Sequence, residues 1–237
     1  MAKVDLRRRS TQSELMDTEP VAFAEFHECL RELEVINVCT LAYRPTMQWL
    51  RRVLEGIKPG KAVSVLDVGS GGGDMLRRIW KLLHRRGLTA DLAGVDLNLW
   101  SKQSAEQATP AEMHIAYEAS DIFSFDPSRR ADFIVCSNFT HHLSDSELVR
   151  FIHWMEDHAA RGWFINDLHR HPLPYYFIKL LFGILPLNRL TANDGPISVS
   201  RAFTAADWRR ILAESGVGER AKVKWFFPFR YAVACSK

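Results

Sequence analysis

The stretch VLDVGSGGGD, residues 65–74, decides the fold of this chain of 237 residues. Its first half is a run of apolar and β-branched residues, which is typical of a strand buried in a parallel sheet. Its second half is a glycine cluster that leads into DMLRRIWKLLHRRG at 74–87, where apolar residues recur at helical spacing. A glycine-rich turn between a strand and a helix lets the backbone approach a nucleotide closely. The stretch therefore predicts a nucleotide-binding loop at 69–73.

Short apolar strands alternate with helical segments along the rest of the chain. This alternation predicts βαβ units and an α/β fold, a doubly wound, Rossmann-like sheet of seven strands covered by helices on both faces. The predicted strands after the first are ADLAGVDLN (90–98), MHIAYEASD (113–121), ADFIVCSNF (131–139), GWFINDL (162–168) and a final hairpin, AKVKWFF and FRYAVACS, around Pro228.

Two segments lie outside this repeating pattern. Residues 1–56 are expected to form an N-terminal helical cap, poorly ordered over the first 20 residues, on a core formed by residues 57–237. A helical insertion after the fifth strand, at about 168–203, is rich in aromatic and aliphatic residues and ends in the turn-rich sequence NDGPISVSR. We expect this insertion to be lid-like, either a moving lid or an oligomer interface.

Three kinds of nucleotide ligand can be tested against the glycine loop. A triphosphate loop needs a lysine after its last glycine, and this loop has none. A dinucleotide loop needs a glycine where this chain has Asp74, whose carboxylate would repel a pyrophosphate at the helix N-terminus. Asp67 and Asp74 better suit a nucleoside that carries positive charge and no phosphate, such as S-adenosylmethionine (SAM).

The motifs VLDVGSGGG, GVDLN and ASDIF occur in this order at successive strand ends and resemble those of class I SAM-dependent methyltransferases. The resemblance covers about residues 60–168 and implies SAM as the cofactor, with S-adenosylhomocysteine (SAH) as its product. It places Asp96 at the ribose hydroxyls, and Asp121 with Ile122 at the adenine. The complete set of cofactor-binding residues that it implies is Asp67, Gly69, Ser70, Gly71, Gly73, Asp96, Leu97, Asp121, Ile122, Ser137 and Asn138.

The sequences QSELMDTEP, INDL and DGPISVSRAFT resemble a narrower group, small bacterial methyltransferases associated with polyketide and phenolic pathways. Similar O-methyltransferases have histidines after the fourth strand and an acid after the fifth. The matching catalytic candidates are His141, His142 and Asp167, because a histidine base suits a phenol whose pKa is ~10. The alternatives are a structural role for His142, a place in the pocket wall or on the surface for His141, and, for Asp167, orienting the base or capping the following segment.

The acceptor is expected to be a small hydrophobic aromatic molecule, bound between the cap and the insertion. The candidate pocket residues are Tyr43, Arg44, Asn166, Tyr176 and Arg201, although Arg201 and Asp194 could instead pair with each other. No metal is expected, because His141, His142, His169 and His171 do not by themselves establish converging ligands.

Composition narrows the possible functions only slightly. The net charge of +3 and the dispersed arginine pairs do not indicate a nucleic-acid partner. The four cysteines form no CxxC pair and no segment is apolar for long enough to span a membrane, so we expect a cytoplasmic protein, either monomer or homodimer. O-methylation is the leading hypothesis. The alternatives are C- or N-methylation of a quinone-like or amine metabolite, RNA or protein methylation, and a non-catalytic SAM-binding role.

Overall fold

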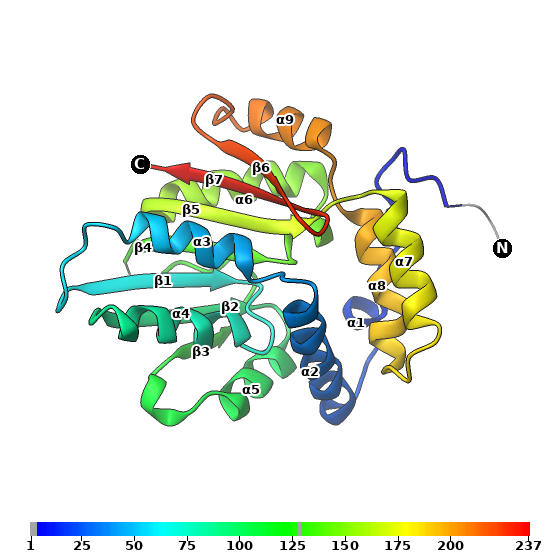
Figure 1. Cartoon of the computed structure of the whole chain (residues 1–237), viewed down its shortest axis with the longest axis horizontal. Coiled ribbons are helices and arrows are strands. Elements are labelled where there is room, and N and C mark those ends of the chain that lie inside the picture. The colour runs from blue at the N-terminus through cyan, green and yellow to red at the C-terminus, as the bar shows by residue number, and fades with distance from the viewer. Residues whose placement is uncertain (1–3, 128) are drawn as a thin grey trace.

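The computed structural model describes residues 4–127 and 129–237 (Figure 1). Within these residues the predicted fold class is confirmed: the sheet has seven strands in the order β3-β2-β1-β4-β5-β7-β6. Strand β7 is antiparallel to both of its neighbours, whereas β1 to β5 pair in parallel. The strands are β1 Ala62–Val68, β2 Thr89–Asp96, β3 Ala116–Ala119, β4 Ala131–Ser137, β5 Ala159–Leu168, β6 Lys222–Phe226 and β7 Arg230–Ser236.

Helices cover both faces of the sheet, which explains why the central strands are apolar along their whole length. In β1, Val63 and Val65 face one core, and Leu66 and Val68 face the other, because successive side chains alternate. Helices α3 (Arg44–Val53), α4 (Asp74–Arg85) and α5 (Leu99–Ala108) lie over the first core, and α6 (Asp145–His158) and α9 (Ala205–Glu214) lie over the second.

The remaining helices gather beyond the carboxyl ends of the strands (Figure 1, right). They are α1 (Leu15–Thr18), α2 (Phe23–Cys39), α7 (Pro172–Phe182) and α8 (Arg189–Arg201), and short 3-10 turns η1 (Ala111–Met113) and η2 (Thr140–His142) complete the fold. The N-terminal helices and the insertion thus form one layer over the edge of the sheet where its ligand is expected. No helix in the described ranges combines the length and apolar character needed to cross a membrane.

Residues 4–20 differ from the expectation that the first 20 residues are poorly ordered, and residues 1–3 lie outside the described residues. Ser10 donates its backbone N–H to the carbonyl of Ser200 at 3.0 Å. The carboxylate of Asp194 accepts the backbone N–H groups of Leu15 and Met16 at 2.8 and 3.0 Å, so it caps the start of α1. These partners are about 180 positions away in the sequence, which a local pattern cannot reveal.

The turn-rich sequence NDGPISVSR also differs from its expectation, because it is helical in α8. Its turn-type residues serve packing instead. A side chain at Gly195 would overlap the ring of Phe182 in α7, and Asp194 is occupied by α1. Asp194 therefore does not pair with Arg201, whose guanidinium binds backbone carbonyls.

Replacing Asp194 with alanine is expected to lower the free energy of unfolding by about 1–2 kcal/mol, because two backbone N–H groups of α1 lose their acceptor. Urea unfolding of both proteins measures the difference. Asp157→Ala, at an exposed position of α6, is the matched control and should stay within about 0.5 kcal/mol of the unmodified chain. Equal unfolding energies for the two variants would contradict the capping role.

Candidate active site

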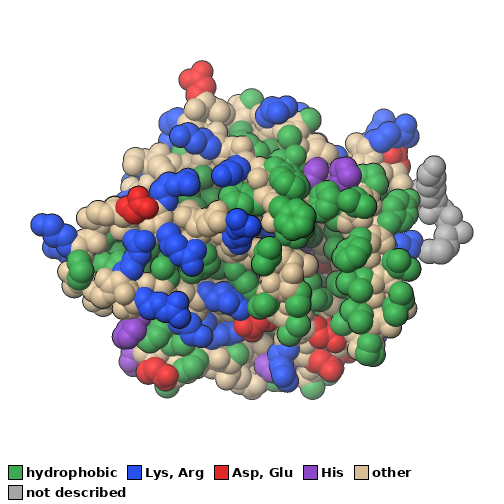
Figure 2. Space-filling view, viewed as in Figure 1, with side chains coloured by type: hydrophobic (Ala, Val, Ile, Leu, Met, Phe, Trp, Pro, Cys, Tyr) green, Lys and Arg blue, Asp and Glu red, His purple; other side chains and the backbone are tan. Residues whose placement is uncertain are grey.

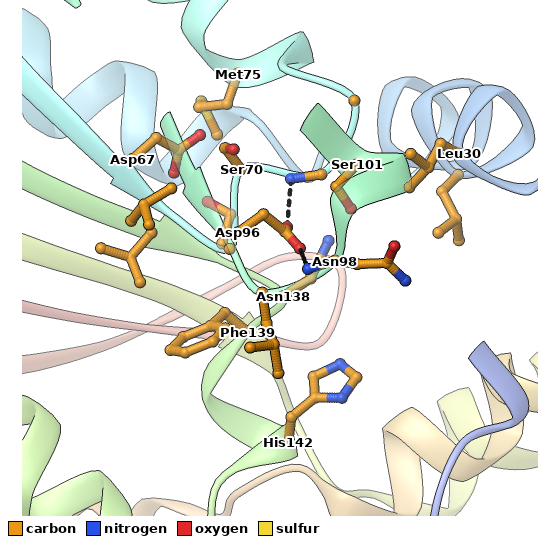
Figure 3. Close-up of a pocket in the computed structure, with 18 of the residues that line it drawn as sticks. Leu30, Asp67, Ser70, Met75, Asp96, Asn98, Ser101, Asn138, Phe139 and His142 are labelled. Carbon is orange, nitrogen blue, oxygen red and sulfur yellow. Dashed lines mark hydrogen bonds between the residues drawn. The ribbon is translucent and has the colours of Figure 1, made fainter. Parts of the chain in front are cut away.

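A cavity of about 910 Å³ lies between the carboxyl ends of the strands and the helices α1 and α2 (Figure 3). The glycine loop after β1, the ends of β2 and β4, and the turn after β3 all contribute to its wall. Its volume is at the upper end of the range for small-molecule sites, about 300–1,000 Å³, so a cofactor and a small acceptor can fit together.

The glycine loop forms one wall through its backbone. Gly69, Gly71 and Gly73 have φ angles of 69°, 50° and 73°, a region that favours residues without a side chain. A Cβ at Gly69 would lie 2.7 Å from Cδ2 of Phe139, so the two loops approach too closely for any larger residue. Gly73 is the N-cap of α4 and, unlike Gly69, Ser70 and Gly71, does not line the cavity.

Asp96 is held rigidly at the end of β2. Its Oδ2 accepts the N–H of Gly71 at 2.9 Å and its Oδ1 accepts the N–H of Asn98 at 3.0 Å, so one carboxylate connects the glycine loop to the start of the next helix (Figure 3). Burial raises the pKa of Asp96, and these two hydrogen bonds oppose that effect. The carboxylate keeps further acceptor capacity for a ligand in the cavity.

Asp67 presents an acceptor that the protein itself leaves unused. The residue is only 2% exposed, it lines the cavity, and its Oδ1 has no hydrogen-bond partner among the described residues. Burial raises its pKa well above the usual value, and the charges of Asp74 and Asp96 add to the effect. An unpaired carboxyl oxygen in a cavity wall fits the ammonium group of SAM, because a cation would stabilise its charged form.

Asp74 does not share this property, although the sequence grouped it with Asp67. The hydroxyl of Tyr43 donates a hydrogen bond to its carboxylate, which ties α4 to the start of α3. Burial raises the pKa of Asp74, and the hydrogen bond from Tyr43 opposes the rise. Burial, and then the nearby charge of Asp74, raise the pKa of Tyr43 in turn. Of the two acids, Asp67 is therefore the one with a fully buried oxygen that has no hydrogen-bond partner among the described residues.

The other candidate cofactor residues surround the same cavity. Asp121 lies at its rim, where its Oδ1 accepts the N–H of Phe123 at 3.1 Å, and Ile122 is buried beside it. The remaining candidates that line the cavity are Leu97, Ser137 and Asn138. Lining residues that the sequence did not suggest include Asn98, Leu99, Ser101 and Phe139.

The two adjacent histidines of η2 have different surroundings. His141 is buried, and its Nδ1 lies 2.7 Å from Oδ1 of Asp167. Asp167 also accepts hydrogen bonds from the hydroxyl of Thr140 and, at 3.0 Å, from the N–H of His141. Burial alone would raise the pKa of Asp167, but the charge and hydrogen bond of His141 outweigh it and hold that pKa well below its usual range. His141 does not line the cavity, so this pair fixes the turn after β4.

His142 does line the cavity, and its side chain is 24% exposed (Figure 3). Its Nδ1 lies 2.8 Å from Oδ2 of Asp17 in α1. Burial lowers the pKa of His142, but the hydrogen bond to Asp17 and the charge of Glu14 outweigh it, so the pKa is raised. Asp17 was not among the sequence candidates. In the sequence, Asp17 is visible only as one of two acids in ELMD at 14–17. No pattern of neighbouring residues indicates that it contacts residue 142.

The predicted substrate residues differ in whether they line the cavity. Tyr43 lines the cavity but is bonded to Asp74, whereas Arg44 is exposed outside it. Asn166 is buried below the cavity and donates to the carbonyl of Ala42 and the hydroxyl of Thr46. Of these three candidates, Tyr43 therefore lines the cavity, whereas Arg44 and Asn166 do not.

The insertion does not line the cavity either. Tyr176 belongs to the exposed apolar face of α7, visible in Figure 2 as hydrophobic side chains gathered over that helix. Arg201 donates to the carbonyls of His141 and His142 at 3.0 and 2.8 Å, so it supports η2 from behind. The apolar cavity wall comes instead from Met16 of α1 and from Phe26, Leu30 and Leu33 of α2.

Arg230 is a further residue that the sequence did not suggest. Its guanidinium is buried and donates to the side-chain oxygens of Asn166 and Asn138, which holds the ends of β4 and β5 together. Burial lowers its pKa to about 10, despite the opposing charge of Asp167.

Three similar solved structures share the fold at low sequence identity. The magnesium protoporphyrin IX methyltransferase from Synechocystis PCC 6803 with bound SAH is 17% identical, with a TM-score of 0.55, and the match covers 84% of this chain and 82% of that one. The plantazolicin methyltransferase BpumL in complex with SAH and a desmethyl analogue is 15% identical, with a TM-score of 0.60, covering 94% of this chain and 92% of that one. Human N-acetylserotonin methyltransferase with SAM is 17% identical, with a TM-score of 0.52, covering 73% of this chain and 47% of that one. At these identities the likeness shows the fold alone. Among curated proteins, none matches the sequence significantly.

A family model described as a methyltransferase domain matches residues 41–217, which is most of the chain. This range contains the glycine loop, Asp96 and η2. The prediction of SAM as the cofactor is confirmed at this level, together with the strand order of the class I fold. The chain belongs to the methyltransferase domain family.

Proposed function

We propose that this chain transfers the methyl group of SAM to an oxygen atom of a small hydrophobic phenolic or polyketide-like acceptor. The observation that carries the proposal is His142, which faces the cavity with its Nδ1 held by Asp17. This arrangement leaves Nε2 as the atom that receives a proton.

The cofactor has a matching residue for each of its polar parts. Asp96 would accept the two ribose hydroxyls, Asp67 would accept the ammonium, and Asp121 with Ile122 would hold the adenine. SAM supplies an electrophilic methyl carbon on a sulfonium, so the protein need only orient the acceptor and receive its proton. The backbone of Gly69 to Gly71 would lie against the amino-acid part.

The acceptor would lie against the apolar wall formed by Met16, Phe26, Leu30 and Leu33. This wall suits an aromatic or polyketide-like ring, because a ligand site is mostly apolar with a few placed polar groups. His142 would be the placed polar group of this acceptor site, because its imidazole lines the cavity and is hydrogen-bonded to the carboxylate of Asp17.

Removal of the proton is the step that favours oxygen as the acceptor atom. A phenol has a pKa of ~10, so a neutral phenol is a poor nucleophile near pH 7. A histidine whose pKa is raised by a carboxylate is a stronger base, and the same carboxylate stabilises the imidazolium that forms. His141 and Asp167 act as positioning residues, because they fix the turn that carries His142.

Mass spectrometry tests the proposal directly. The full chain is incubated with SAM and a library of small phenols, and the product and its methylated position are identified. We expect a methyl ether on at least one phenol and no product from the same phenol methylated beforehand. Methylation at carbon or nitrogen would contradict the proposal, as would SAM binding without transfer to any phenol.

A further inference from the structure

We propose that Glu14, His141 and His142 form a binding site for one divalent cation of the zinc type, at the junction of the N-terminal segment and η2. One ligand atom from each of the three side chains lies within 4.8 Å of the other two. Glu14 comes from the residue before α1, and the histidines come from the turn after β4.

The spacing of these atoms fits ligands of one ion better than direct hydrogen bonds. Nε2 of His141 lies 3.6 Å from Oε1 of Glu14, and Nε2 of His142 lies 3.8 Å from Oε2. An N–H···O hydrogen bond spans about 2.7–3.2 Å. Two ligands of one tetrahedral zinc ion, each at about 2.0–2.2 Å from the metal, lie about 3.4 Å apart. The two histidines approach different oxygens of Glu14, and the limit of 4.8 Å exceeds the spacing around zinc, so the three side chains would move toward one another when an ion binds.

Both histidines are already oriented as metal ligands usually are. Nδ1 of His141 is bonded to Asp167 at 2.7 Å, and Nδ1 of His142 is bonded to Asp17 at 2.8 Å. Because a carboxylate can only accept, each Nδ1 carries the hydrogen, and each Nε2 keeps its lone pair at 3.6 or 3.8 Å from an oxygen of Glu14. A histidine that binds a metal almost always donates its other ring N–H to such a partner.

The negative charge at and near Glu14 also favours the binding of a cation. Its carboxylate is 2% exposed, and the hydroxyl of Ser198, at 2.9 Å from Oε1, is the only hydrogen-bond donor to it among residues 4–127 and 129–237. Asp17 and Asp167 add two more acids behind the histidines. The guanidinium of Arg201 lies close enough to lower the pKa of Asp17, but it donates to the carbonyls of His141 and His142 and forms no ion pair with Glu14 among the described residues. A buried carboxylate with so little compensation is costly unless a cation neutralises it.

The chemistry of the donors selects the kind of ion. Two imidazoles and one carboxylate are a ligand set of zinc and similar transition metals, with a fourth position left for water. Magnesium and calcium prefer sites built from oxygen atoms, so they should bind weakly here.

Binding would have two consequences for the protein. The ion would fasten the N-terminal segment to the core, and α1 carries Met16 and Asp17 into the cavity wall. It would also occupy Nε2 of His142, so zinc should inhibit methyl transfer; this second consequence rests on the proposed function.

Calorimetric titration of the metal-free full chain with ZnCl₂, without SAM or acceptor, tests the site. We expect one ion per chain, a rise in Tm on binding, and little heat with MgCl₂. Glu14→Gln and His141→Ala should weaken zinc binding by at least about 100-fold, and Asp17→Asn by about 10–100-fold. His84→Ala, at an exposed position of α4, is the matched control and should bind as the unmodified chain does.

No binding, or equal affinity in the Glu14→Gln variant, would overturn the proposal, and the second result would place the ion elsewhere. If Glu14→Gln fails to fold, the zinc affinities of Ser198→Ala and Asp17→Asn are compared with that of the unmodified chain instead. Ser198 is hydrogen-bonded to Glu14 and Asp17 to His142, so each variant should weaken zinc binding through one of the proposed ligands. Zinc binding without any methyl transfer in metal-free buffer would contradict the proposed function alone. Transfer without zinc binding would contradict the metal site alone.

Discussion

Replacing His142 with alanine is expected to lower kcat by about 10²–10⁴-fold, because the acceptor's proton loses its base. The affinity for SAH should stay nearly unchanged, since the acids proposed to bind the cofactor, Asp67, Asp96 and Asp121, lie at the ends of β1, β2 and β3. Initial rates with a methylated phenol as product, measured in the presence of a chelator, give kcat, and calorimetry gives the affinity for SAH. His84→Ala should change neither quantity.

The partner of His142 provides a second comparison. Asp17→Asn removes the charge that orients the imidazole and stabilises its protonated form, so it should lower kcat in the same direction. Combined with His142→Ala, it should cause almost no further loss, because the two residues act as one unit. Unchanged rates in the His142→Ala variant would show that positioning alone accounts for the transfer. Independent, additive losses would show that Asp17 acts on something other than His142.

The parts of this site that the sequence predicted are those fixed by short stretches of chain. VLDVGSGGGD contains its own strand, its own turn and the start of its own helix, so its structure follows from about ten neighbouring residues. Asp96 and Asp121 follow strands, and parallel strands bring their carboxyl ends to one edge. The fold class and the cofactor edge could therefore be predicted together.

The acceptor side could not be predicted in this way, because it depends on contacts between distant segments. Asp194 caps a helix 179 positions away, and Asp17 orients a histidine 125 positions away. The aromatic insertion suggested a pocket wall by composition alone, but its apolar residues support α1 or face outward. The residues that line the wall, Phe26, Leu30 and Leu33, matched an ordinary packing helix equally well.

Replacing Asp96 with alanine should weaken SAH binding by about 10²–10⁴-fold, because the proposed assignment gives this carboxylate two hydrogen bonds from the ribose, each contributing about 1.5–3 kcal/mol. The loss has a second source in this structure. Asp96 also accepts the N–H groups of Gly71 and Asn98, so its removal leaves two loops of the cavity without their common anchor. Calorimetric titration with SAH measures the affinity without the complication of turnover.

Asp91→Ala distinguishes loss of the site from loss of the fold, because Asp91 lies on the same strand at an exposed position near its start. It should bind SAH as the unmodified chain does. Asp96→Asn should fall between the two, since an amide keeps one acceptor oxygen and loses the charge. If Asp96→Ala bound SAH normally, the ribose would have to lie away from β2, and the assignment of the cavity would be wrong. If it bound weakly but also lost several degrees of Tm relative to Asp91→Ala, the anchoring of the two loops would be the larger of its two roles.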